Sequence, residues 1–226
     1  DTITLDGSTI QDASAGTNVS TTVAFSAITG TFDSGDTTPP TITARETADL
    51  DGDGYIDAIH ITFSENIDDT NVTASDFDVA GITGEAFSST TNSDTADDAD
   101  IYITFTDGFL STMSTPTLQY TKGTLTDLAG NFLQNDGPTA TTDKAGPAIW
   151  SAVASDESNA INGIDSDDTV TITFSENTTQ PTINAGNINT VLALNNSHSW
   201  LDGASAITSA SWSDNQTLVV TLLNGG

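Results

Sequence analysis

The segment 49–57 offers the most specific chemistry in this sequence. It reads Asp-Leu-Asp-Gly-Asp-Gly-Tyr-Ile-Asp and matches the first nine positions of an EF-hand-type calcium loop. Carboxylates this close together repel one another unless a cation lies between them, and the glycine at the sixth position supplies the sharp turn. The segment therefore predicts a calcium site. The expected ligands are Asp49, Asp51, Asp53, Asp57 and the backbone carbonyl of Tyr55.

One ligand of this pattern is missing. Position 12 holds His60 instead of a bidentate Glu, and His60 lies inside an alternating apolar segment that predicts a strand. The missing ligand must therefore come from elsewhere in the chain. The candidates are Glu65, which follows that strand, and Asp36, which precedes the first strand.

Two other acidic segments match a ligand loop less closely. The segment 156–168 is looser and longer, and we expect Asp156, Asp165 and Asp167 to share a second calcium ion. The run 94–100 reads Asp-Thr-Ala-Asp-Asp-Ala-Asp and precedes another strand-like segment. Acidic runs of this kind are usually solvated, so we expect a solvated loop there.

Apolar and polar residues alternate with a period of two in several places, which predicts strands. These strands must position the acidic loops. No segment of ten or more residues has apolar side chains at helical spacing. The sequence therefore predicts an all-β chain, in which loops rich in Ser, Thr, Asn, Asp and Gly connect short strands. The clearest strand-like segments are 59–63, 101–105, 170–174 and 218–222.

An internal repeat indicates the size of the domains. Phe-Ser-Glu-Asn at 63–66 returns at 174–177, 111 positions later, and each copy ends a strand-like segment. Pro-containing segments, 39–42 and 146–149, open the two copies. A period near 110 residues is that of an immunoglobulin-like (Ig-like) β-sandwich. We therefore predict tandem Ig-like β-sandwich repeats of about 110 residues each, with the calcium loops near the domain junctions.

The repeat divides the chain into three parts. Residues 38–145 form a complete Ig-like copy, whereas 146–226 lack its last strands. Residues 1–37 look like the second half of a preceding repeat or of one completed by a neighbour. Two explanations remain open: the chain is a window of a continuous array, or each subunit donates its first half repeat to the next by strand complementation, which builds a head-to-tail filament.

Charge and composition exclude several classes of protein. The chain has 32 acidic residues, 27 of them Asp, against 3 basic ones, which gives a net charge of −29. Nucleic acids and anionic membrane surfaces are bound by clustered Lys and Arg, so neither is an expected partner. With no Cys there is neither a disulfide nor a thiolate metal site. The apolar runs are too short for membrane insertion.

Three motifs together resemble a known family. They are Pro-Pro-Thr-Ile at 39–42, the repeated Phe-Ser-Glu-Asn, and Asp-Leu-Ala-Gly-Asn at 127–131. The combination resembles the bacterial and archaeal Ig-like repeats of surface-layer proteins and large cell-surface adhesins. This resemblance implies an extracellular, repeated structural module, and it implies no catalytic residue.

These features predict a structural protein of the cell surface. We expect a building unit of a surface layer, stalk or filament, made of calcium-stiffened Ig-like repeats whose partners are copies of the same chain or neighbouring repeats. The alternative is a carbohydrate- or surface-binding module of an extracellular adhesin or secreted enzyme. Exposed aromatic rings would serve such a module, but we expect Trp150, Trp200 and Trp212 to pack in a core or at a junction.

No residue pattern suggests an enzyme. The two histidines, His60 on a strand and His198 in a polar loop, lack a nucleophile in a recognisable pattern. Turns and metal loops explain most of the carboxylates. N-glycosylation sequons are about as frequent as chance predicts, and they make a glycan possible without indicating one. They begin at Asn18, Asn71, Asn177, Asn195 and Asn215.

Overall fold

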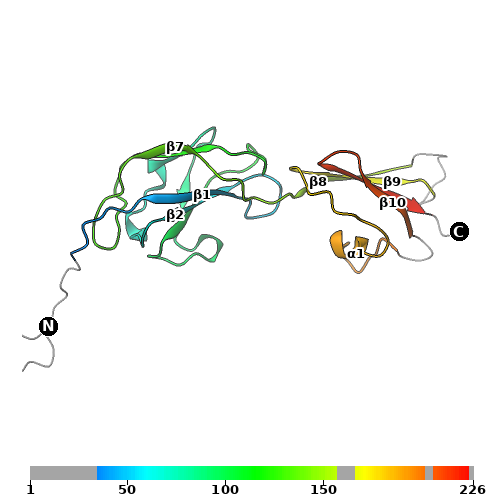
Figure 1. The fold of residues 1–226 in the computed structure, drawn as a ribbon, viewed down its shortest axis with the longest axis horizontal. Helices are drawn as coiled ribbons and strands as arrows, with labels where there is room; N and C mark the ends of the chain where they lie inside the picture. The colour runs from blue at the N-terminus through cyan, green and yellow to red at the C-terminus, as the bar shows by residue number, and fades with distance from the viewer. Residues whose placement is uncertain (1–34, 157–165, 202–205, 224–226) are drawn as a thin grey trace, which may run out of the picture. The chain divides into compact units, whose positions relative to one another are not determined.

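The computed structural model describes residues 35–156, 166–201 and 206–223 (Figure 1). By its internal contacts the chain forms two compact units, Asp1–Thr37 and Thr38–Gly226. Only residues 35–37 of the first unit are described, so the half repeat predicted at 1–37 lies almost entirely outside the described residues. The second unit contains every strand reported below.

The first part of the second unit is a sandwich of two antiparallel sheets. One sheet has the strand order β1-β2-β5-β4 and the other the order β3-β6-β7. Short 3-10 helices, η1 (Asp69–Asn71), η2 (Ala74–Asp76) and η3 (Thr91–Ser93), lie in the connections. The strands are β1 (Ile42–Ala48), β2 (Ala58–Phe63), β3 (Phe77–Val79), β4 (Ala86–Phe87), β5 (Asp100–Thr104), β6 (Thr117–Tyr120) and β7 (Asp136–Ala140).

Alternation in β2 and β5 builds the core of this sandwich. In their antiparallel register Ile59 pairs with Ile103 and Ile61 with Ile101. All four side chains are fully buried, because residues two apart point to the same face of a sheet. Tyr120 of the facing sheet is buried in the same cluster.

The second part of the unit contains one four-stranded sheet among its described residues, with the order β10-β11-β9-β8. Its strands are β8 (Ile149–Ser155), β9 (Thr169–Phe174), β10 (Ala206–Trp212) and β11 (Thr217–Leu223), and the helix α1 spans Ile188–Val191. Ile172 of β9 and Leu218 of β11 form a second core cluster with Ile188. The segment around α1 therefore provides apolar cover for one face of this sheet.

The repeated Phe-Ser-Glu-Asn follows the same local geometry in both parts. Ile42 pairs with Phe63 in β1 and β2, and Ile149 pairs with Phe174 in β8 and β9. In each pair the register shifts immediately after the isoleucine. The two copies of the tetrapeptide therefore begin at the end of strands that are paired alike.

The all-β prediction is confirmed for the described residues. The four predicted strand-like segments coincide with β2, β5, β9 and β11 to within a residue or two. The α-helix has four residues. None of the described helices has the length and apolar character that a membrane crossing requires.

Candidate metal centre

The predicted calcium loop, residues 49–57, connects β1 to β2, and we call it the metal loop. The N–H of Asp57 donates to the carbonyl of Ala48 (3.1 Å) and closes the loop at its base. The carbonyl of Gly54 accepts from the N–H of Thr112 (3.1 Å), which holds the tip against a neighbouring segment. Gly52 (φ +78°) and Gly54 (φ +96°) have left-handed backbones that favour glycine.

Three of the predicted ligands converge in this loop. A carboxylate oxygen from each of Asp49, Asp51 and Asp53 lies within 4.8 Å of the others. The loop backbone fixes Asp49, because the N–H of Gly52 donates to Oδ1 (2.7 Å) and that of Gly54 to Oδ2 (2.8 Å). The carboxylates are thus held near one another by the turn itself.

Asp57, the fourth predicted carboxylate, interacts with the same group. Its Oδ1 accepts from the N–H of Leu50 (3.0 Å). Burial raises the pKa of Asp57, the bond from Leu50 opposes that rise, and the charges of Asp51 and Asp49 add to it. Negative charge therefore accumulates at the metal loop.

Asp107 is a further carboxylate at this place, and sequence reasoning missed it. It follows β5, which runs antiparallel to β2, so it lies at the same end of the sheet as the metal loop. Partial desolvation, and then the charges of Asp53, Asp51 and Asp49, raise the pKa of Asp107. Asp107 can therefore supply the oxygen that position 12 of the calcium pattern lacks. Only the pairing of β2 with β5 could have indicated it.

The three basic side chains of the chain have partners away from this group. Arg45 forms an ion pair with Asp136, Lys144 lies 3.8 Å from Glu46, and Lys122 donates to Gln134 (3.1 Å). In the described part of the chain, no Lys or Arg forms an ion pair with a metal-loop carboxylate. A hard cation with oxygen ligands would supply the missing positive charge.

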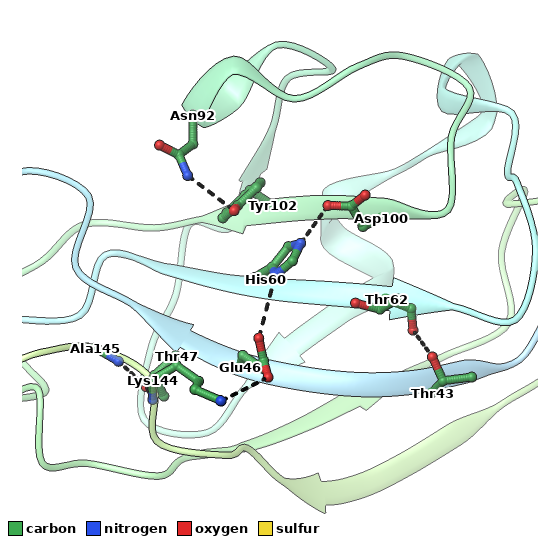
Figure 2. A network of polar contacts seen from close by, with 10 residues as sticks. All are labelled: Thr43, Glu46, Thr47, His60, Thr62, Asn92, Asp100, Tyr102, Lys144 and Ala145. Carbon is green, nitrogen blue, oxygen red and sulfur yellow. Dashed lines mark hydrogen bonds and ion pairs between the residues drawn. The ribbon is translucent and has the colours of Figure 1, made fainter.

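His60, at position 12 of the pattern, belongs to a different network (Figure 2). Its Nε2 lies 2.5 Å from Oδ2 of Asp100, and its Nδ1 lies 3.8 Å from Oε2 of Glu46. The ring stacks on Tyr102 with the centroids 4.5 Å apart. On the outer face of the sheet, the side chain of His60 therefore has Asp100, Glu46 and Tyr102 as its partners.

The metal loop contacts the part of the unit that begins at β8. The rings of Tyr55 and Trp150 lie 5.4 Å apart. A Cβ placed on Gly54 would lie 2.3 Å from Nε1 of Trp150 and 2.8 Å from Cβ of Ser175. The hydroxyl of Ser175 in turn lies 2.7 Å from that of Thr112. The tip of the loop is therefore part of the contact between the first sandwich and the chain that begins at β8.

Glu65, one of the two candidates for the missing ligand, lies away from the metal loop. Glu65 follows β2, whereas the metal loop precedes it, so the six residues of that strand separate them. Its carboxylate lies within 4.8 Å of that of Asp127 instead. Which residue completes the loop stays a prediction, and Asp107 is a further candidate beside Glu65 and Asp36. Asp36 belongs to the other unit, Asp1–Thr37.

Asp127 organises the Asp-Leu-Ala-Gly-Asn turn. It is 2% exposed, and its carboxylate accepts from the N–H groups of Ala129 (2.9 Å) and Asn131 (2.8 Å) and from the side-chain amide of Asn131 (2.8 Å). Burial pushes the pKa of Asp127 upward, but these hydrogen bonds outweigh it and hold the pKa below the ordinary 3.8.

We expect Asp127→Ala to lower the free energy of unfolding by about 3 kcal/mol, because the turn loses a buried charged acceptor of several hydrogen bonds. The lowered pKa means that ionised Asp127 stabilises the fold above its unfolded pKa, near 3.8, and that this stabilisation is lost as the pH falls through the folded value. Denaturant unfolding at neutral and acidic pH measures both effects. Asp78→Ala, at the exposed position of β3, is the control, and equal stability of the two variants would contradict this role.

The second predicted calcium site is only partly within the described residues. Asp156 and Asp167 are exposed on either side of the segment 157–165, and Asp165 lies inside that segment, outside the described residues. Among the described residues, neither Asp156 nor Asp167 belongs to a group of side chains that could hold a metal ion. This site remains a prediction.

The run 94–100 departs from the solvated loop that its composition predicts. Carboxylate oxygens of Asp94, Asp98 and Asp100 lie within 4.8 Å of one another, and Oδ2 of Asp94 is buried. The difference arises because the segment packs back on the chain after β2, where the N–H of Ile67 donates to the carbonyl of Asp98 (2.8 Å).

The tryptophans pack largely as predicted. Trp200 and Trp212 lie against the second core cluster, and Trp212 ends β10. Trp150 lies at the contact with Tyr55, although 43% of its surface stays exposed. No row of tryptophans is therefore displayed on one face of the described sheet.

The sequons differ in accessibility. Asn177, Asn195 and Asn215 are exposed, whereas Asn18 lies outside the described residues. The side-chain amide of Asn71 donates to Asp68 (2.9 Å) and to Thr126 (3.0 Å). A glycan on Asn71 would have to break these contacts.

Residues 36–142 match the model of a bacterial Ig-like domain, Big_5. The match covers the first sandwich together with the metal loop, and the all-β, antiparallel structure therefore contains one bacterial Ig-like domain. Domains of this kind are typically non-catalytic binding or structural modules and are commonly extracellular. No curated protein and no solved structure matches the chain significantly.

Proposed function

We propose that this chain is a structural module of an extracellular surface assembly, and that calcium in the metal loop stiffens the contact between its Ig-like domain and the sheet that follows. The proposal extends the bacterial Ig-like domain at residues 36–142, a type of domain that is often extracellular. Tandem repetition of that domain, with a second Ig-like fold from residue 146, is part of the proposal.

One observation carries this proposal: the same few residues provide the carboxylates and the contact with the following sheet. Asp53 and Tyr55 are neighbours of Gly54, against which Trp150 packs. An ion bound by Asp53 and by the carbonyl of Tyr55 would fix the backbone on both sides of that contact. Loss of the ion would release the turn and leave the carboxylates to repel one another.

The net charge of −29 gives the ion a second effect. Like charges destabilise a compact chain through repulsion, and bound divalent cations offset part of it. The metal-free chain should therefore be less compact as well as less rigid at the junction. Extracellular modules bind calcium with Kd values on the order of 0.1 to 1 mM.

Assembly follows from the incomplete cover of the second sheet. Among the described residues, the Ig-like domain has two sheets, whereas the region from β8 onward has one. We propose that further strands complete it, supplied either by the next repeat of a continuous array or by the first half repeat of a neighbouring copy. In both cases the partner is a repeat of the same kind, which suits a surface layer, stalk or filament.

Small-angle X-ray scattering of the whole chain tests the stiffening. We expect a smaller radius of gyration in millimolar calcium than in excess chelator, and an Asp51→Asn/Asp53→Asn variant that stays expanded in both. Asp78→Asn removes one exposed charge from β3 and serves as the control. Identical scattering of the parent with and without calcium would rule out the proposed role.

The mass of the native material after denaturation in a chelator distinguishes the two modes of assembly. Subunits near the 23.3 kDa of this sequence would indicate strand complementation between copies. A much larger single chain would indicate a continuous array. Native material that is monomeric at this mass under all calcium concentrations would contradict assembly altogether.

A cavity on the Ig-like domain favours glycan binding as a second candidate function. It has a volume of about 300 Å³, and its lining includes Glu46, His60, Asn92, Tyr102 and Lys144. Polar groups beside an aromatic ring are typical of sugar sites. Tyr102→Ala should then abolish retention on polysaccharide columns, and the absence of any retention of the parent would exclude this candidate.

A further inference from the structure

Asp69 is a buried acidic residue that the proposed function does not use. It opens η1 after β2 and is 6% exposed. Both of its carboxylate oxygens are buried and have no hydrogen-bond partner in the protein. A carboxylate withdrawn from water without a partner is strongly destabilising, so either a proton or a bound cation must neutralise it at this place.

Other carboxylates surround Asp69. Its N–H donates to Oδ1 of Asp97 (3.2 Å). Burial raises the pKa of Asp69 to about 6, the backbone N–H of Asp97 opposes that rise, and the charges of Asp94, Asp97 and Asp98 add to it. Oδ2 of Asp94 is also buried and without a hydrogen-bond partner. Two separate side chains thus present unpartnered buried oxygens to one region.

Backbone hydrogen bonds hold these residues together. The N–H of Phe63 donates to the carbonyl of Ala99 (2.7 Å), which continues the pairing of β2 with the chain before β5. Oδ1 of Asp98 accepts from the N–H of Asp100 (3.1 Å). The cluster is therefore built where β2 ends and β5 begins rather than on a free loop.

No protein cation neutralises this cluster. In the described residues, Asp69, Asp94 and Asp98 form no ion pair with Lys or Arg. His60 is the nearby basic group, and its Nε2 contacts Asp100. That contact leaves the buried oxygens of Asp69 and Asp94 without a counterion.

We propose that Asp94, Asp98 and Asp100, whose carboxylate oxygens lie within 4.8 Å of one another, bind a divalent cation together with the buried carboxylate of Asp69, with calcium as its natural occupant. Carboxylate oxygens are the ligands that calcium prefers, and its coordination geometry tolerates irregular sites. This site is distinct from the metal loop, because the two lie at opposite ends of β2, roughly 20 Å apart for a six-residue strand. The Ig-like domain would therefore hold one ion at each end of its first sheet.

Calcium binding to four variants of the whole chain tests this site. Equilibrium dialysis against calcium, followed by metal analysis, gives the number of bound ions. Asp69→Asn should bind one ion fewer than the control Asp78→Asn, and the metal-loop variant Asp51→Asn/Asp53→Asn should lose a different one. Asp94→Asn, at a less buried position, repeats the test if Asp69→Asn does not fold.

Thermal unfolding in chelator and in calcium distinguishes a calcium ligand from a residue that has only a structural role. In chelator, Asp69→Asn should be at least as stable as the parent, because it removes a buried charge without a partner. In calcium, it should be less stable than the parent, because the bound ion stabilises only the parent. This reversal of order is the expected signature of a ligand.

The possible outcomes separate this site from the metal loop. Equal numbers of ions in Asp69→Asn and Asp78→Asn would overturn the second site and leave the metal loop untouched. Loss of all bound calcium in the Asp51→Asn/Asp53→Asn variant would also overturn the second site. Binding that depends on Asp69 alone would support the second site and contradict calcium in the metal loop.

Discussion

Replacing Gly54 by alanine is expected to lower the free energy of unfolding by about 3 kcal/mol or more, and to weaken calcium binding. A non-glycine residue in a strained backbone conformation costs about 1–3 kcal/mol, and the backbone here has φ +96°. The added Cβ would also lie 2.3 Å from Nε1 of Trp150, and overpacking of this kind costs about 1–3 kcal/mol. Denaturant unfolding and calcium titration measure the two effects.

Gly81 provides a matched control for this variant. Its φ is +87°, and a Cβ placed there would meet nothing within 4 Å. Gly81→Ala therefore reports the backbone strain alone, and the difference between the variants reports the clash with Trp150 and Ser175. Combining Gly54→Ala with Trp150→Ala should recover the part of that difference that Trp150 causes. Equal effects of Gly54→Ala and Gly81→Ala would show that Trp150 does not pack on the metal loop.

Removal of calcium is the second large expected effect. At a free calcium concentration about 100 times the Kd, one bound ion stabilises the folded chain by about 2.7 kcal/mol. Chelation should therefore lower the Tm by about 5–11 °C, at about 2–4 °C per kcal/mol for a unit as large as Thr38–Gly226. Differential scanning calorimetry in calcium and in chelator measures the shift.

Substitutions at the metal loop provide the control for chelation. The Asp51→Asn/Asp53→Asn variant should lose most of the Tm shift that comes from calcium in the metal loop. The Asp78→Asn variant should keep this shift. Magnesium in place of calcium should give a smaller shift, because Mg²⁺ demands a stricter octahedral geometry. A Tm that chelation leaves unchanged would refute calcium as a stabilising ligand.

The strands of this protein could be predicted from the sequence because their cause is local. The alternation of Ile59 and Ile61 with polar residues is visible in the sequence, and both side chains are buried. The metal loop could be predicted for the same reason, since Asp49, Asp51 and Asp53 are close in sequence as well as in space.

The contributions from distant segments could not be predicted. Asp107 joins the metal loop only because β5 pairs with β2. Glu65 looked close in sequence, but β2 carries it away from the loop to the other end of the strand, beside Asp127. Asp69 gave no sequence signal, because its burial depends on the packing of the segment before β5.

Terbium luminescence tests the central claim most directly. Tb³⁺ substitutes for calcium at oxygen sites, and it emits when a nearby aromatic ring absorbs the light. Tyr55 lies within the metal loop, and its ring is 5.4 Å from that of Trp150, so an ion in the loop has an antenna beside it. We predict a saturable emission that calcium displaces and that Asp51→Asn/Asp53→Asn removes, with Asp78→Asn unaffected. Emission and calcium displacement that persist unchanged in the Asp51→Asn/Asp53→Asn variant would contradict a calcium site in this loop.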